Sequence, residues 1–231
     1  MWKKIVSILC LVTTIIMSLC AMHEIIPYYQ AYKNRNELNK KVISQYTKIQ
    51  LPVTNTDVTE DVVKTNIDFE ELQRINPDII GWISAPQINV DYPILRGETD
   101  EEYLNKDYNG NYTYLGSIFT WTDTDKLMNN DHIVIFGHNC IGRQMFGGLK
   151  DFRDADFMAN NPYIDIYTPT QHKLLEVYNA EVVHCTDERL QPTYKNNSLE
   201  QSITLAACYG PQGTEYRMLV ACKVIETEEL F

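Results

Sequence analysis

Positive charge is scarce in this sequence. The 231 residues contain 20 Lys and Arg against 31 Asp and Glu, which gives a formal net charge of −11 at pH 7. General nucleic-acid binding needs clustered Lys and Arg to displace counterions, so the composition argues against that class of function. Internal repeats and low-complexity tracts are also absent, and the hydrophobic fraction of 44% is ordinary for a globular protein. The sequence therefore predicts one acidic globular domain with an appendage, and it argues against disorder.

The six cysteines include no C-x-x-C pair. A disulfide framework normally belongs to smaller domains than this one, so the cysteines are expected to be separate thiols. A zinc site is conceivable, although its ligand spacing would match no common zinc pattern. Its four ligands would be His138, Cys140, His184 and Cys185.

Charge is missing altogether from residues 5–22, which are mostly Ile, Leu, Val, Met and Cys. At about 1.5 Å per residue, this stretch is just long enough to cross a bilayer core of roughly 30 Å. A cleaved signal peptide is the alternative, but residues 18–21 (SLCA) form a poor cleavage site, so we favour a retained signal-anchor. The two lysines in residues 1–4 place that end in the cytoplasm and the rest of the chain outside.

Between the anchor and the domain, residues 23–65 are expected to form an extracellular stalk. Their first half has a periodicity that permits a helix, and residues 50–65 (QLPVTNTDVTEDVVKT) have the composition of a linker. The compact domain is expected to occupy residues 66–231 and to begin with a short helix capped by Asp68. The apolar positions Phe69, Leu72 and Ile75 would share one face of that helix.

The rest of the domain is mainly β. Short β-rich runs separated by loops predict a sandwich or a barrel of eight strands. These runs cover residues 79–84, 88–94, 117–121, 132–136, 163–168, 173–184, 202–207 and 217–225. Residues 143–160 break the pattern and predict one or two short helices.

Three residues at strand ends form a chemically coherent set. Cys208 ends an apolar run, His138 follows the run HIVIFG, and Arg217 opens the last run nine positions after Cys208. A hairpin of that length can bring the guanidinium beside the thiol. A thiolate is the nucleophilic form of cysteine, a histidine can exchange protons with an amine, and a guanidinium can stabilise an oxyanion. Each residue alone is more often structural, so only the combination points to a catalytic set, and it does not specify the reaction.

The motifs in this region resemble those of a known family. The segments DFEELQRINPDIIGWI, NVDYPIL, YLNKDYNG, GSIFTW, IVIFGHN and MFGGLKDF resemble class B sortases, in the same order along the chain. The segment TLAAC with a downstream arginine is similar to the sortase pattern Thr-Leu-x-Thr-Cys with its downstream Arg. The likeness covers residues 68–224, nearly all of the expected domain.

The resemblance implies a fold, an activity and a location. Sortases are cysteine transpeptidases, peptidase-type thiol enzymes of Gram-positive bacteria, with an eight-stranded β-barrel outside the cytoplasmic membrane. They cleave an NPxTN-like or LPxTG-like sorting signal after its Thr, hold the surface protein as a thioester, and pass it to an amine of the cell wall or of a pilin. On the matching positions Cys208 would be the nucleophile, His138 the general acid and base, and Arg217 the oxyanion and substrate-orienting residue. This chemistry requires no metal and no organic cofactor.

The sequence departs from the family pattern in two places. Sortases usually have Thr before the Cys and class B members often have Ser one place earlier, but here these positions are Ala207 and Ala206. We expect both, with Thr204 and Leu205, to contribute to substrate binding. Class B sortases usually insert a long helix where this chain has only residues 184–202, so the subclass and the exact signal stay open.

Several alternatives stay open. The chain could be a cysteine peptidase that only hydrolyses, or a weakly catalytic sortase-like scaffold. Residues 51–55 (LPVTN) resemble a sorting signal, by chance or as a pseudosubstrate that occupies the groove. Cys140 could form an inhibitory disulfide with Cys208, whereas Cys222 is expected in the core. The three histidines expected at the surface or at strand edges are His132, His172 and His184.

Overall fold

The chain divides into two compact units, Met1–Lys48 and Ile49–Phe231. The computed structural model describes residues 2–46, 67–195, 200–211 and 213–230. The expected linker, including the signal-like segment at 51–55, lies outside the described residues.

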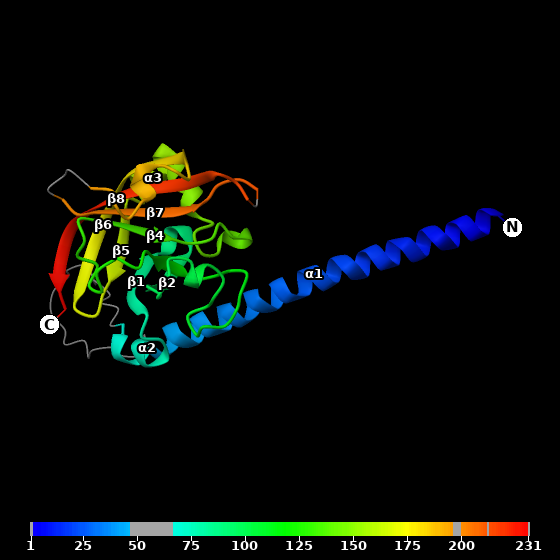
Figure 1. Ribbon diagram of the computed structural model, residues 1–231, viewed down its shortest axis with the longest axis horizontal. Helices are drawn as coiled ribbons and strands as arrows, with labels where there is room; N and C mark the ends of the chain where they lie inside the picture. The colour runs from blue at the N-terminus through cyan, green and yellow to red at the C-terminus, as the bar shows by residue number, and fades with distance from the viewer. Residues whose placement is uncertain (1, 47–66, 196–199, 212, 231) are drawn as a thin grey trace, which may run out of the picture. The chain divides into compact units, whose positions relative to one another are not determined.

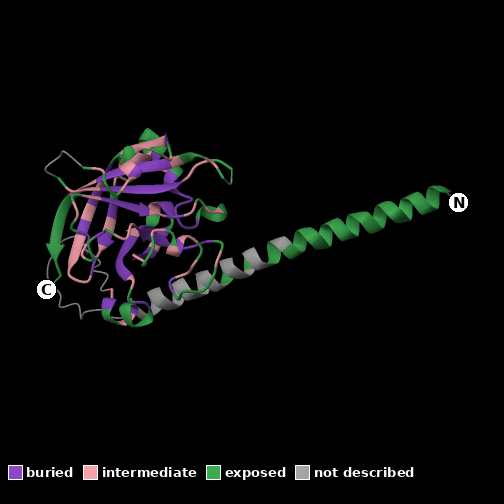
Figure 2. Cartoon of the chain, in the orientation of Figure 1, coloured by how far each residue is buried: buried purple, intermediate pink, exposed green. Residues whose placement is uncertain are grey.

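The first unit is one long helix, α1 (Trp2–Tyr46), drawn in blue in Figure 1. Its segment Trp2–His23 has a mean hydropathy of 2.5, and none of it is buried (Figure 2). Among the described residues it is the one helix long and apolar enough to cross a membrane. It is therefore a candidate membrane anchor, and the helix continues well beyond residue 22, as the periodicity of the stalk permits.

The second unit is built around a closed barrel of eight strands, as the sequence predicts (Figure 1). The order around the barrel is β1-β2-β3-β4-β7-β8-β6-β5, and β5 pairs with β1 to close it. The strands are β1 (Ile79–Ala85), β2 (Val90–Leu95), β3 (Ile118–Thr120), β4 (His132–Phe136), β5 (Tyr163–Tyr167), β6 (Gln171–His184), β7 (Ser202–Cys208) and β8 (Tyr216–Glu229). Strand β2 starts two residues later than the predicted run, because Ile88 belongs to a 3₁₀ turn, η1 (Pro86–Ile88).

Two of the strand pairs are parallel, β2 with β3 and β4 with β7, and the others are antiparallel. Parallel neighbours need a long connection, and the chain between β4 and β7 carries β5, β6 and the intervening turns. Since parallel strands run in the same direction, the carboxyl ends of β4 and β7 meet at one end of the barrel.

Both faces of β7 are buried, as the purple strands in Figure 2 illustrate. Ile203, Leu205 and Ala207 belong to the core inside the barrel. Ala206, which alternates with them, belongs to a smaller cluster on the outer face together with Val134 and Leu219 of the adjacent strands. By the same alternation the Cys208 side chain faces outward.

Short helices fill the connections. In α2 (Phe69–Ile75), Phe69 and Leu72 are buried as expected, but Ile75 is exposed. The segment predicted to hold one or two helices contains a 3₁₀ helix, η4 (Leu149–Arg153), and α3 (Ala155–Asn160). Three further 3₁₀ turns are η2 (Glu102–Leu104), η3 (Ile141–Arg143) and η5 (Glu188–Leu190).

The cap of α2 gives a stability prediction. Asp68 Oδ1 accepts a hydrogen bond of 2.9 Å from the backbone N–H of Glu71. Replacing a capping carboxylate by Ala costs about 1 kcal/mol. We expect Asp68→Ala to lower the free energy of unfolding by about that amount in chemical denaturation, whereas Asp68→Asn, which keeps an oxygen acceptor, should retain most of it. Equal losses in both variants would contradict the capping role.

Candidate active site

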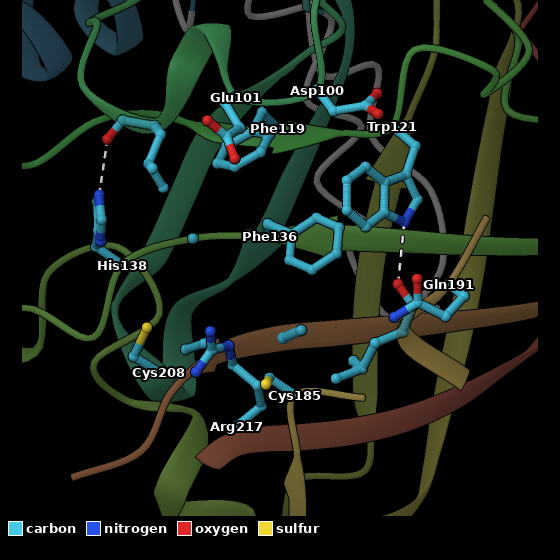
Figure 3. Close-up of a pocket in the computed structure, with 15 residues that line it drawn as sticks. Asp100, Glu101, Phe119, Trp121, Phe136, His138, Cys185, Gln191, Cys208 and Arg217 are labelled. Atoms are coloured by element: carbon cyan, nitrogen blue, oxygen red, sulfur yellow. Dashed lines mark hydrogen bonds between the residues drawn. The ribbon is translucent and has the colours of Figure 1, made fainter. Parts of the chain in front are cut away.

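A pocket of about 380 Å³ opens on the outer face of the barrel beside the ends of β4, β7 and β8. Its floor is apolar, and polar side chains surround that floor (Figure 3). The apolar members are Leu104, Phe119, Trp121, Phe136, Leu190, Ala206 and Ala207. The others are Asp100, Glu101, Gly137, His138, Cys185, Gln191, Cys208 and Arg217. The pocket therefore contains all three residues that the sequence singles out for chemistry.

Strand register brings these three residues together. Cys208 is the last residue of β7 and pairs directly with Arg217 of β8, which confirms the expected hairpin. Phe136 of β4 pairs with Ala206 of β7, and the Gly137 N–H donates to the Ala206 carbonyl at 3.1 Å. His138 is two residues beyond Phe136, as Cys208 is two residues beyond Ala206, so the imidazole and the thiol leave adjacent strand ends.

The three side chains gather at one side of the pocket. Figure 3 shows the Cys208 sulfur directed toward the His138 ring, with the Arg217 guanidinium extending toward Cys208. Cys208 is a free, half-buried thiol. Cys208 therefore lines the pocket as a partly accessible thiol.

Arg217 is held by backbone groups of its own hairpin. Its Nη1 donates to the carbonyl oxygens of Thr214 at 2.8 Å and Tyr216 at 3.0 Å. A guanidinium carries five N–H donors in a fixed planar fork. Because both bonds use one nitrogen, the remaining donors are available to an anionic or carbonyl oxygen in the pocket.

His138 is held by the loop that contains η2. Its Nε2 lies 2.7 Å from the carbonyl oxygen of Leu104, the bond drawn beside His138 in Figure 3. Leu104 also lines the pocket. The sequence did not indicate Leu104 as part of the site, because it contributes a backbone carbonyl, which every residue type has.

A short loop between β6 and β7 forms another wall of the pocket. Trp121 Nε1 donates to the Leu190 carbonyl at 3.1 Å, and His132 Nε2 donates to the Arg189 carbonyl at 2.9 Å. Arg189 in turn pairs with Asp187 and Glu181 at 2.8 and 2.7 Å. The two ring bonds hold this part of the loop against β4 and against the residue that follows β3.

His132 is more enclosed than a surface residue. It begins β4, its ring also bonds the Ser202 hydroxyl at 2.7 Å, and it packs edge-on against Tyr194. Burial lowers its pKa, partly opposed by the bond to the Arg189 carbonyl. His132 therefore supports the loop as a neutral ring, whereas His172 and His184 lie at the partly exposed strand edges expected of them.

The pocket also contains two carboxylates that the sequence did not indicate. Asp100 and Glu101 lie on the far side of the apolar floor from Arg217 (Figure 3). Asp100 Oδ1 accepts a bond of 2.9 Å from the Thr122 N–H, which fixes its loop against the segment after β3. The pocket thus has a negative side and a positive side.

The four residues expected to bind substrate separate into two pairs. Ala206 and Ala207 line the pocket. Leu205 belongs to the core inside the barrel, and Thr204 is buried, so neither is among the pocket residues. Leu205 and Thr204 instead stabilise the strand that carries the other two.

The remaining cysteines differ in environment. Cys185 lines the pocket, and Cys140 is a half-buried, reduced thiol. Cys222 is fully buried in the barrel core, as the sequence predicts, and burial raises the pKa of its thiol. Among the residues that the structure describes, no group of three or more His, Cys, Asp or Glu side chains is placed to hold a metal ion, and this includes the four that the zinc alternative requires.

Comparison with known proteins places the barrel in a family. The family model described as "Sortase domain" matches residues 83–225, which is more than half of the chain. The chain therefore belongs to the sortase family.

Two curated relatives and one solved structure that resemble this chain are class B sortases. It is 29% identical over 129 residues to sortase B of Staphylococcus aureus, covering 56% of this chain and 53% of that protein. It is 32% identical over 111 residues to sortase B of Listeria monocytogenes, covering 45% of each chain. The chain thus spans about half the length of these curated relatives. The structure of a Staphylococcus aureus sortase B–substrate complex aligns with a TM-score of 0.62 and 26% identity, covering 68% of this chain and 84% of that one.

The two thiol environments predict different reactivities. With the folded chain, iodoacetamide should modify Cys208 but leave Cys222 unmodified, because Cys222 is fully buried and its raised pKa disfavours the thiolate. Peptide mass spectrometry measures both sites. Denaturation before alkylation is the control and should expose Cys222. Modification of Cys222 in the folded protein at the rate of Cys208 would contradict the placement of this thiol in the core.

Proposed function

We propose that this chain is a membrane-anchored sortase that transfers surface proteins to an amine acceptor. The observation that carries the proposal is the convergence of Cys208, His138 and Arg217 on one pocket, through the pairing of β4 with β7 and of β7 with β8. Family membership supports the same conclusion independently.

In the first half-reaction, the Cys208 thiolate attacks the carbonyl carbon of the Thr in the sorting signal. Negative charge develops on the carbonyl oxygen, and the donors of Arg217 stabilise it. His138 as imidazolium protonates the nitrogen of the departing residue, the C–N bond breaks, and the surface protein stays bound as a thioester.

In the second half-reaction, an acceptor amine attacks the thioester. His138, now neutral, takes the proton that the amine loses, and the Cys208 thiolate leaves as the new amide bond forms. The His138 ring thus returns to the imidazolium form. Atoms and charge balance over the two halves without a cofactor.

The substrate is proposed to be a sorting signal of NPxTN or LPxTG type near the carboxyl terminus of a surface protein. The apolar floor suits the aliphatic parts of such a peptide, and Arg217 suits its backbone carbonyls. The Staphylococcus aureus sortase B that aligns with this chain was solved as a complex with substrate, which supports substrate binding on a barrel of this kind.

The acceptor is proposed to be an amine of a cell-wall precursor or of a pilin. Asp100 and Glu101 supply negative charge on the side of the pocket away from Arg217. This charge attracts a protonated amine in preference to neutral water, and the amine loses one proton to solvent before it attacks as the neutral nucleophile. It is the observation that supports transfer over simple hydrolysis.

The membrane topology is proposed from the sequence. Residues 1–4 would lie in the cytoplasm, residues 5–22 would span the membrane, residues 23–65 would form the stalk, and residues 66–231 would form the extracellular catalytic domain of a Gram-positive bacterium. The apolar segment Trp2–His23 supports the anchor.

Removal of the nucleophile tests the function directly. With the full chain in detergent micelles, a library of fluorogenic NPxTN-like and LPxTG-like peptides, plus an oligoglycine amine, should yield cleaved and ligated products. Cys208→Ala should abolish both, whereas Cys20→Ala, which removes a thiol from α1, should abolish neither. Cleavage without ligation would identify a peptidase. If folded wild-type protein forms a thioester with none of the peptides, the proposal is contradicted.

Replacement of Arg217 tests the oxyanion role. Arg217→Lys keeps the positive charge but loses the planar fork, and the loss of one oxyanion donor typically costs about 10²–10³ in kcat. We expect a fall of that size in single-turnover acylation, with unchanged thermal stability. An acylation rate within about twofold of wild type would show that another group stabilises the oxyanion.

A further inference from the structure

The His138 ring has one nitrogen occupied before any substrate binds. Nε2 lies 2.7 Å from the Leu104 carbonyl oxygen. A carbonyl oxygen only accepts hydrogen bonds, so the hydrogen belongs to Nε2. In the neutral ring Nδ1 is then the unprotonated nitrogen, and it is the one free to exchange protons. The loop that carries Leu104 therefore selects the tautomer of His138.

The space around this bond exists because residue 116 is glycine. Gly116 has a φ of +55°, and a Cβ built on it would lie 2.3 Å from the Leu104 oxygen and 3.0 Å from His138 Cδ2. It would also lie 2.9 Å from the Tyr103 carbonyl oxygen. Real Cβ atoms do not approach backbone oxygens so closely, so a side chain at 116 forces a shift among residue 116, the Tyr103–Leu104 backbone and the His138 ring.

Tyr103 fixes the same loop from the other side. Its hydroxyl donates to Asp78 Oδ2 at 2.7 Å and accepts from Asn76 Nδ2 at 2.7 Å, and its carbonyl accepts from the Ser117 N–H at 3.0 Å. Burial, followed by the bond to Asp78, raises the pKa of the Tyr103 phenol. The hydroxyl is therefore a permanent donor, and the residue directly before Leu104 cannot move without breaking buried bonds.

We propose that the Leu104 carbonyl is a positioning group for His138, which it holds as the Nε2–H tautomer with Nδ1 directed to proton exchange, and that Gly116 and Tyr103 keep this carbonyl in place. The inference rests on the proposed function for its catalytic meaning. The carbonyl has the orienting role that a third residue has in other nucleophile–histidine pairs, without adding a charge to the pocket.

The tautomer is measurable without any assay of activity. The full chain, labelled with ¹⁵N-histidine in detergent micelles, is examined by long-range ¹H–¹⁵N correlation at alkaline pH, where imidazoles are neutral. The chain has five histidines, and the signals lost in His138→Gln assign this ring. We expect the nitrogen pattern of the Nε2–H tautomer. The Nδ1–H pattern, or a mixture of the two as in free histidine, would overturn the proposal.

Kinetics of two glycine variants test the contact itself. Gly116→Ala should lower kcat about 10²-fold, the cost of a misplacement near 1 Å, with KM within about twofold. Gly110→Ala is the matched control, because Gly110 also has a positive φ, +82°, but a Cβ there meets nothing within 4 Å. It imposes a similar backbone strain on the same loop and should leave kcat unchanged.

The outcomes separate this inference from the proposed function. Equal loss of kcat in both glycine variants would attribute the effect to loop strain and overturn the role of the Leu104 contact. If Gly116→Ala does not fold, the tautomer of the His138 ring in wild-type protein still tests the proposal. If wild-type protein forms no thioester with any peptide, the proposed function fails, while the ¹⁵N pattern continues to report on the Leu104 carbonyl alone.

Discussion

The parallel pairing of β4 with β7, beside the antiparallel pairing of β7 with β8, is the constraint on which the site depends. It places residues 138, 208 and 217 at one end of the barrel, although β5 and β6 lie between residues 138 and 208 in the chain. A slip of one residue would turn every side chain of β7 to the opposite face and direct Cys208 into the core. Two buried residues oppose such a slip. Leu205 would leave the core inside the barrel, and Ala206 would leave the smaller cluster on the outer face. Core packing and the geometry of the candidate site are therefore enforced by the same contacts.

The part of the β6–β7 connection that lines the pocket, residues 185–191, is held by side chains from other parts of the barrel. Its backbone carbonyls at Arg189 and Leu190 accept bonds from the rings of His132 and Trp121, which belong to other parts of the barrel. The ion pairs of Arg189 are partly exposed, and such pairs alone contribute little. The two ring donors have a stronger effect on position, since each satisfies a loop carbonyl while burying an aromatic surface. Rigidity of this wall follows from tertiary contacts more than from local propensity.

Much of the fold was predictable because its signals are local. The eight β-rich runs, the Asp68 cap and the Cys208–Arg217 hairpin each follow from neighbouring residue types, and the structure confirms them. The missed contributors act across the chain or through the backbone. The Leu104 carbonyl approaches His138 from 34 positions away. Asp100 and Glu101 enter the pocket only because the loop after β2 folds over it. Periodicity does not encode such approaches, and a family resemblance indicates the motif without its geometry.

The Ala206–Ala207 pair has a physical consequence for the proposed oxyanion site. Side chains alternate along β7, so with Cys208 facing the pocket, Ala207 faces the barrel core, where it is buried. A hydroxyl at that position would point inward and would need a partner among Ile, Leu and Met side chains. What this residue offers the pocket is therefore its backbone, whatever its side chain. Ala206 faces the pocket side, but it packs against Leu219 and Val134 and is almost fully covered. The absence of hydroxyls at these two positions therefore changes little in the candidate site, where Arg217 is the proposed oxyanion donor.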